Sequence, residues 1–193
     1  MVTVRSIEDH HEIRRFETGH AGGERYTSLV FSPGGRFLAK VGDGQVPLVW
    51  SLDSGEAVFQ DAPEGGSAPT FSANHRFVAL ASWEEVCCFD LATGRKLSRW
   101  KAAGRVHSLQ FYPTDNRIAV GYKDGPWASV YDATNGREIA RLEVGEGWRM
   151  VVGWHPEGRH LAVGSTALGI QIWDVETQRR LARLEGQAHE VTF

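Results

Sequence analysis

The sequence is poor in cysteine and in long apolar stretches. Cys87 and Cys88 are the only cysteines, and on a β-strand two neighbours point to opposite faces, which disfavours a disulfide between them. No apolar run reaches the roughly 18 residues of a membrane span, and the N-terminus lacks the apolar core of a secretory signal. We therefore predict a cytoplasmic protein that does not bind a membrane.

Charge of one sign is also scarce. The net charge is only −3 at pH 7, whereas nucleic-acid and membrane surfaces usually need a pronounced basic excess. We predict no nucleic-acid partner.

Glycine and tryptophan are abundant, with 22 and 7 residues, and runs of helix-favouring residues are few. Many glycines indicate many turns, and many tryptophans indicate many aromatic core positions. The composition predicts an all-β protein.

One pattern recurs four times along the chain. It is anchored on Phe31, Phe71, Phe111 and Trp154, at spacings of 40, 40 and 43 residues. In each unit a short strand ends on the aromatic residue, a turn follows, and three more short strands come after it. Even spacing of four short strands per unit is typical of propeller blades.

We call the four strands of a unit a, b, c and d. Residues 2–17 align without gaps onto the sequence that starts at Ile170, so they read as strands c and d of a blade. Residues 189–193 read as strand a of another. The expected fold is one all-β β-propeller domain over residues 1–193, with four complete four-stranded blades plus partial blades at both termini. The complete blades are expected at residues 26–60, 67–100, 105–143 and 147–185.

Such an array would not close on itself, because strand b is missing between the two partial blades. Unclosed arrays leave apolar faces at their ends, which normally need a cap or another blade. We therefore expect the chain to be a piece of a longer propeller, with blades supplied by further sequence, or to complete itself by self-association.

An aromatic residue followed by aspartate closes strand c in most units, and a Gly-His pair, Gly19-His20, precedes the first strand a. In these motifs the chain resembles the WD-repeat β-propeller family, and the resemblance covers essentially the whole sequence. The repeats are divergent, because no unit carries the family's full polar network; the first unit, for example, has no hydroxyl in its strand b. The residues that the resemblance marks as structural are His20, Asp43, Trp50, Asp90, Asp132, Trp173 and Asp174.

Recurrence separates structural residues from candidate binding residues. Trp83, Trp127 and Trp148 stand where the repeat asks for no aromatic residue, in expected b–c or d–a loops, and Lys123 and Arg149 lie near them. In the WD-repeat family these loops gather on one face, and exposed aromatic and cationic side chains are typical of binding hot spots. The resemblance implies a protein-interaction scaffold that binds a protein partner through these five residues. The alternative is that the rings only cover blade edges.

No pattern in the sequence indicates catalysis, a cofactor or a metal. Nucleophile motifs, phosphate loops and metal-ligand spacings are missing, and the recurring aspartates fit a turn better than an active site. We therefore predict no enzyme, no catalytic residue, no cofactor and no metal site. Two alternatives stay open. The turn before Trp100 is similar to that of quinoprotein propellers, which hold a quinone cofactor, and the chain would also fit a non-functional fragment of a larger multidomain protein.

Overall fold

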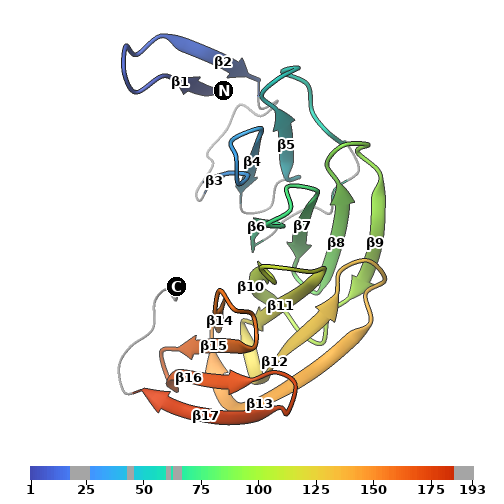
Figure 1. Ribbon diagram of the computed structural model, residues 1–193, viewed down its shortest axis with the longest axis vertical. Helices are drawn as coiled ribbons and strands as arrows, with labels where there is room; N and C mark the ends of the chain where they lie inside the picture. Colours follow the sequence, from blue (N-terminus) through green and yellow to red (C-terminus); the bar gives the residue numbers. More distant parts are fainter. Residues whose placement is uncertain (18–26, 43–45, 60–61, 63–66, 185–193) are drawn as a thin grey trace.

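The structure is a computed structural model, and it describes residues 1–17, 27–42, 46–59, 62 and 67–184. This part of the chain contains seventeen antiparallel strands in five sheets and no helix. The sheets follow one another in chain order along an open arc, with a hairpin at the N-terminal end (Figure 1). The predicted all-β propeller architecture is confirmed.

Three sheets have four strands each, hydrogen-bonded in sequence order. They are blade 2, with β6 (Ser67–Phe71), β7 (Phe77–Ser82), β8 (Glu85–Asp90) and β9 (Lys96–Lys101); blade 3, with β10 (Val106–Phe111), β11 (Arg117–Tyr122), β12 (Asp124–Asp132) and β13 (Glu138–Trp148); and blade 4, with β14 (Val151–Trp154), β15 (His160–Ser165), β16 (Gly169–Asp174) and β17 (Arg179–Leu184).

In the described part of residues 26–60 the structure has three strands, where the sequence predicts four. These strands, β3 (Thr27–Phe31), β4 (Phe37–Gly42) and β5 (Leu48–Ser51), form blade 1. The fourth is reduced to an isolated bridge between Trp50 and Ala57. Next to this bridge the Val58 N–H donates to the Val49 carbonyl at 2.8 Å, and Phe59 stacks on Phe89 of the next blade with ring centroids 4.0 Å apart.

Residues 2–17 contain the hairpin β1 (Val2–Arg5) and β2 (Glu12–Phe16). Its apolar face covers blade 1: Phe16 is buried and stacks on Trp50 at 4.9 Å between ring centroids, and Leu38 completes the contact. The expected strand at 189–193 lies outside the described residues.

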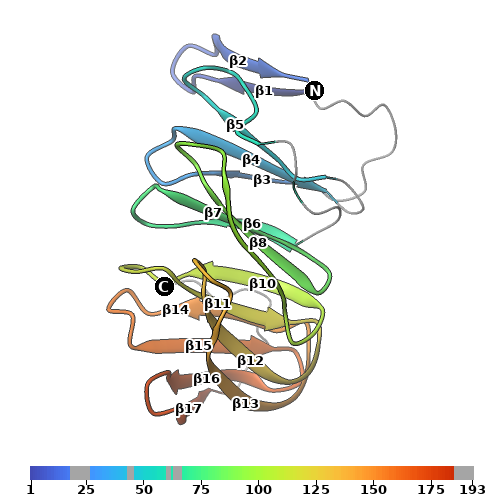
Figure 2. The same cartoon turned by 90° about the vertical axis from the view of Figure 1, so that its right-hand side faces the viewer.

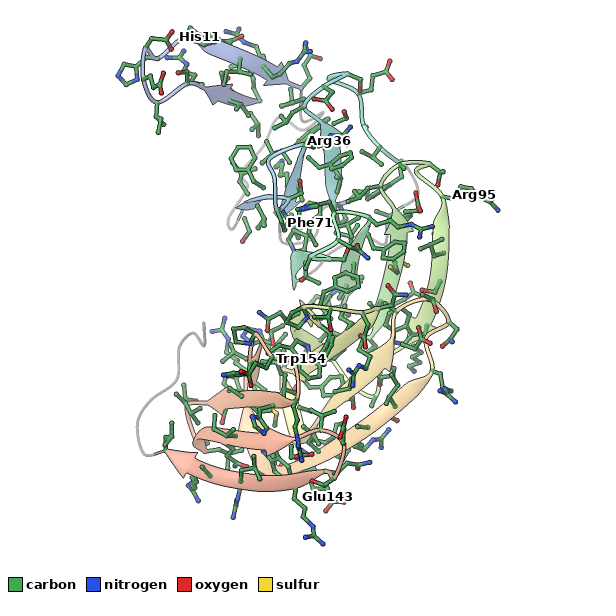
Figure 3. All side chains as sticks on the ribbon, viewed as in Figure 1. His11, Arg36, Phe71, Arg95, Glu143 and Trp154 are labelled. Atoms are coloured by element: carbon green, nitrogen blue, oxygen red, sulfur yellow. The ribbon has the colours of Figure 1, made fainter. Side chains whose placement is uncertain are left out.

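The core consists of the spaces between successive sheets, which side chains fill (Figure 3). Because strand neighbours point to opposite faces, Cys87 packs toward blade 1 and Cys88 toward blade 3. Between blades 3 and 4, Leu142 is fully buried together with Trp154 and Trp173. Each fully buried apolar side chain of this size contributes roughly 1.5–3 kcal/mol, so the contacts between blades hold the arc together.

Blade 3 is longer than the predicted range of residues 105–143. Strands β12 and β13 continue to pair until Asp124 lies opposite Trp148. Trp148 was expected in a connection between blades, but it is the last residue of β13. The five residues after the predicted end of strand d stay in the sheet by pairing with the start of β12, across a register shift between Gly125 and Trp127.

The antiparallel order gives every blade two different ends (Figure 2). The a–b and c–d turns lie at one end, which we call the turn end. The b–c loops and the d–a connections lie at the other, which we call the loop end.

Candidate binding face

At the turn end, aspartates that close strand c organise the c–d turns. In Asp132, Oδ1 accepts hydrogen bonds from the Thr134 backbone N–H at 2.9 Å and from the Thr134 hydroxyl at 2.6 Å. Asp90 accepts the same pair of bonds from Thr93. Asp174 accepts from the Thr177 N–H at 2.9 Å and from Arg159 Nε at 2.8 Å. These bonds hold the pKa of Asp174 down at about 2.

The other residues marked by the repeat lie inside the blades. Trp50 and Trp173 are buried. The indole of Trp173 donates to Gln171 Oε1 at 3.2 Å, and Gln171 in turn donates to the Val144 carbonyl in blade 3. His20 and Asp43 lie outside the described residues.

An arginine of the a–b turn meets the c–d turn in three blades. Arg159 pairs with Asp174, Arg76 with Asp90 at 3.4 Å, and Arg36 with Asp53 at 3.1 Å. Sequence reasoning missed this set, although the arginine stands five residues after the anchoring aromatic in each of these units.

At the loop end, Trp83 follows β7 directly and is 55% exposed. Its φ is +41°, a left-handed value that is unusual for a bulky residue. Arg105 lies over the indole, with Cζ 4.4 Å from the ring centroid. Trp83, Arg105 and their neighbours line an open pocket of about 530 Å³, whose other lining residues are Ser82, Glu84, Glu85 and Lys101.

A second aromatic–cation pair occurs one blade further on. Lys123 Nζ lies 5.5 Å from the ring centroid of Trp148, which is 50% exposed. The Arg149 backbone N–H donates to the Lys123 carbonyl at 2.7 Å, and Arg149 also has a positive φ of +54°.

The pairs Trp83–Arg105 and Lys123–Trp148 occupy equivalent positions of the repeat, but the aromatic residue and the cation have changed places. The Val106 N–H donates to the Trp83 carbonyl, just as the Arg149 N–H donates to the Lys123 carbonyl. Trp83 therefore corresponds to Lys123, and Arg105 corresponds to Trp148. The repeat preserves the contact between the two positions, but not the identity of either side chain.

Backbone hydrogen bonds join these pairs into one continuous surface. The Lys123 N–H donates to the Arg105 carbonyl at 2.6 Å, which links the first pair to the second. We call the surface formed by Trp83, Arg105, Lys123, Trp148 and Arg149 the aromatic–cation row. It contains four of the five binding residues predicted from the sequence, and it adds Arg105.

Trp127 does not belong to the row, which corrects its prediction as a loop residue. It lies within β12, partly buried against the cluster between blades 2 and 3. Arg141 from β13 covers its ring at 5.4 Å, and its indole nitrogen is buried. The extension of the β12–β13 pairing draws this tryptophan into the sheet.

Two acidic residues beside the row form ion pairs, whereas the described cations of the row do not. Glu84 pairs with Lys101 at 3.2 Å and Glu85 with Arg99 at 2.6 Å. Among the described residues, the row's own cations, Arg105, Lys123 and Arg149, form no ion pair.

The positive charges of the row also affect His107 in the neighbouring strand β10. Burial lowers the pKa of His107, and the positive charges of Arg149 and Lys123 lower it further. The surroundings of this imidazole are therefore electrostatically positive.

The remaining candidate groups belong to the core or show no assembled site. Burial raises the pKa of the Cys88 thiol to about 12, with smaller contributions from Cys87 and Asp90, so this thiol stays protonated at neutral pH. Trp100 is buried against Tyr131. In the described part of the chain, no three His, Cys, Asp or Glu side chains gather as metal ligands would, and no helix has the length and apolarity to cross a membrane.

No protein-family model matches the chain. A solved structure, the β-propeller domain of Cps50 (Swd1) from Myceliophthora thermophila, superposes with a TM-score of 0.73 at 18% identity and covers 89% of this chain and 58% of that chain. Among curated proteins, pre-mRNA-processing factor 19 homolog 2 of Arabidopsis thaliana is 24% identical over 91% of this chain and 26% of its own length. The chain is a propeller of the WD-repeat type.

Other WD-repeat proteins match as well. Protein HIR1 of Cryptococcus neoformans is 27% identical over 77% of this chain and 14% of its own length. Cell division cycle 20.1 of Arabidopsis thaliana is 34% identical over 30% of this chain and 13% of its own length. The WD-repeat chain thus spans about a quarter or less of the curated relatives it matches.

Proposed function

We propose that this chain is a non-catalytic protein–protein interaction scaffold that binds a partner through the aromatic–cation row. The observation that carries the proposal is the pair of half-exposed tryptophans, Trp83 and Trp148, at positions where the repeat needs no aromatic side chain. Tryptophan and arginine on a rigid backbone are the side chains that dominate binding hot spots. The WD-repeat relatives support the scaffold reading, and one of them is named as a cofactor of a complex.

Rigidity supports the same proposal. The row is fixed by backbone hydrogen bonds that join blades 2 and 3 and the residue after β13. A partner would therefore meet a surface that is ordered before it binds, and the entropy cost of ordering it would be met in folding rather than in binding. The positive φ of Trp83 adds to this argument, because strained backbone is concentrated at functional sites.

The test is affinity capture with quantitative mass spectrometry, comparing three forms of the chain. The double variant Trp83→Ala/Trp148→Ala removes both rings of the row. Arg95→Gln removes an exposed cation at the turn end (Figure 3). We expect a set of proteins that the unmodified chain and Arg95→Gln enrich equally and that the double variant loses by at least tenfold. Equal enrichment by all three forms would contradict binding through the row.

We also propose a cytoplasmic location. Cys87 and Cys88 are buried on opposite sides of β8 and form no disulfide with each other, which suits a reducing compartment. Cell fractionation with an antibody to the chain tests this, and recovery outside the cytoplasmic fraction would contradict it.

Self-association is a further part of the proposal. Leu142 in blade 3 is fully buried by blade 4, whereas Leu184 in β17, at the corresponding place of blade 4, is 51% exposed. An apolar position with this pattern suits contact with another sheet, which a second copy of the chain would supply. Light scattering after size-exclusion chromatography tests this: we expect a dimer or larger species, and a stable monomer with a cooperative melt would contradict it.

A further inference from the structure

The proposed function does not specify the chemistry of the partner. The charges of the aromatic–cation row indicate which kind of partner segment would bind there. Arg105 and Lys123 lie against ring faces rather than against carboxylates. A guanidinium that stacks through its plane keeps the N–H groups at its edge available for a carboxylate. The row therefore offers donors that no described residue already uses.

The acids near the row do not supply those carboxylates. Glu84 and Glu85 are held by Lys101 and Arg99 on the outer side of blade 2. Asp124, the first residue of β12, and Glu146, near the end of β13, lie close in sequence to Lys123 and Trp148, yet neither pairs with a described cation. The lowered pKa of His107, to which Arg149 and Lys123 contribute and no acid does, agrees with a positive surface at this place.

We propose that the aromatic–cation row binds an acidic, extended segment of a partner protein. The partner's carboxylates contact Arg105, Lys123 and Arg149, and an apolar partner side chain packs on the exposed ring of Trp83 or Trp148. The proposal rests on the scaffold function proposed above and names the partner chemistry for that same surface.

The exchange of side chains between blades shapes what the row recognises. In blade 2 the ring is on the b–c loop and the cation on the d–a connection, whereas in blade 3 the cation is on the b–c loop and the ring at the end of β13. Along the row the sequence of groups is therefore ring, cation, cation, ring, and Arg149 is joined to the second cation through its backbone N–H. A matching peptide carries acidic residues in its middle and apolar residues on both sides, and a peptide with the reverse arrangement fits less well.

The direct test measures fluorescence anisotropy with three labelled twelve-residue peptides. The first has a central block of aspartate and glutamate flanked by leucines, the second has asparagine and glutamine in that block, and the third has lysine. We expect the acidic peptide to bind at least tenfold more tightly than the amide peptide, and the lysine peptide not to bind. Equal binding of the acidic and amide peptides would overturn the proposal.

Variants locate the effect on the row. We expect Arg105→Gln to weaken the acidic peptide about tenfold, the loss typical of one charge-assisted hydrogen-bond partner, and Arg105→Glu/Lys123→Glu to weaken it about 100-fold. Asp124→Asn removes a negative charge beside Lys123, so it should tighten binding. Arg95→Gln at the turn end is the matched control and should change nothing. Melting curves by circular dichroism confirm that each variant is folded, and unchanged binding by folded Arg105→Gln would overturn the proposal.

A peptide-display selection separates failure of this inference from failure of the proposed function. If the chain selects neutral or basic peptides whose binding still needs Trp83 and Trp148, the row is a binding surface but the acidic partner is wrong. If no selected peptide depends on those rings, both proposals are overturned. Acidic peptides that lose binding in Trp83→Ala/Trp148→Ala support both.

Discussion

The side chains at the turn end of the blades recur from one repeat to the next, whereas those at the loop end do not. At the turn end the same chemistry recurs: aspartates accept hydrogen bonds from the c–d turn, and an arginine of the a–b turn pairs with that turn in three blades. At the loop end the backbone hydrogen bonds recur, but the side chains on them change from blade to blade. Recurrence therefore marks residues that build the fold, and departure from it marks residues free to serve binding.

The largest stability effect is expected at the turn end. Gly35 and Gly158 hold the same a–b turn position with φ values of +69° and +78°. A Cβ at Gly158 would lie 2.2 Å from Tyr112, whereas one at Gly35 meets nothing within 4 Å. Each alanine variant should lose about 1–2 kcal/mol from the left-handed backbone, and Gly158→Ala about 1–3 kcal/mol more from the overlap. Denaturant unfolding measures both, and equal losses would show that Tyr112 does not confine the turn.

A smaller loss is expected from the aspartates of the c–d turns. Asp132→Ala should cost about 1–2 kcal/mol, because it leaves the Thr134 N–H and hydroxyl without their acceptor. Ser51→Ala in blade 1 should cost less, since the Ser51 hydroxyl accepts one bond, from Ser54 at 3.2 Å. Urea titration measures the free energy of unfolding of both variants. Equal losses in Asp132→Ala and Ser51→Ala would contradict the expected order.

Acid should weaken the turn end through the same group. Burial alone would raise the pKa of Asp132, but the hydrogen bonds from Thr134 and Asn135 lower it on balance below 3.8. A carboxyl with a lowered folded pKa stabilises the fold above its unfolded pKa, and this contribution is lost as the pH falls through the folded value. We expect stability to fall below about pH 4 and to fall less steeply in Asp132→Ala.

Variants at the loop end should change stability little but lose binding. Trp83→Gly relieves a left-handed backbone, so its free energy of unfolding should stay unchanged or rise by up to about 1 kcal/mol. Trp148→Gly, at the end of β13 where φ is not positive, should lose about 1 kcal/mol. Both variants should lose binding of the acidic peptide. A large loss of stability in Trp83→Gly would instead assign this ring to the fold.

The smallest effect concerns His107. Its pKa should lie below 6.5, because burial and the charges of Arg149 and Lys123 oppose protonation. The neutral imidazole therefore stabilises the fold above pH 6.5, and this contribution is lost as the pH falls toward the folded pKa. Titration by NMR should show the pKa rising in Lys123→Gln and in Arg149→Gln. An unchanged value in both variants would mean that burial alone sets it.

The features that recur in every repeat could be predicted from the sequence. Period, turn chemistry and the anchoring aromatic residues were sufficient to place strands a to c of every blade, because each of these features recurs at a fixed spacing. Strand d of blade 1 is the exception, because in the described residues its pairing with β5 is limited to a bridge between Trp50 and Ala57. The sequence of residues 56–59 carries no signal that distinguishes this bridge from a full strand.

The binding face was less predictable for a related reason. Trp127 looked like a loop residue because the pairing of β12 with β13 continues beyond Trp127, to Asp124 opposite Trp148, and a local pattern does not reveal such pairing between distant residues. Arg105 was missed because it follows a plain Ala-Ala-Gly stretch. A signal for it did exist: a shift of 43 residues, the spacing that aligns Phe111 with Trp154, places Arg105 on Trp148.

Hydrogen–deuterium exchange with and without the acidic peptide tests most directly whether the two ends divide architecture from binding. We expect slower exchange on binding in residues 83–85, 102–106, 122–126 and 145–150, and no change in the turns that hold Asp90, Asp132 and Asp174. Protection of those turns, with the aromatic–cation row unaffected, would contradict the division and would place the binding surface at the turn end.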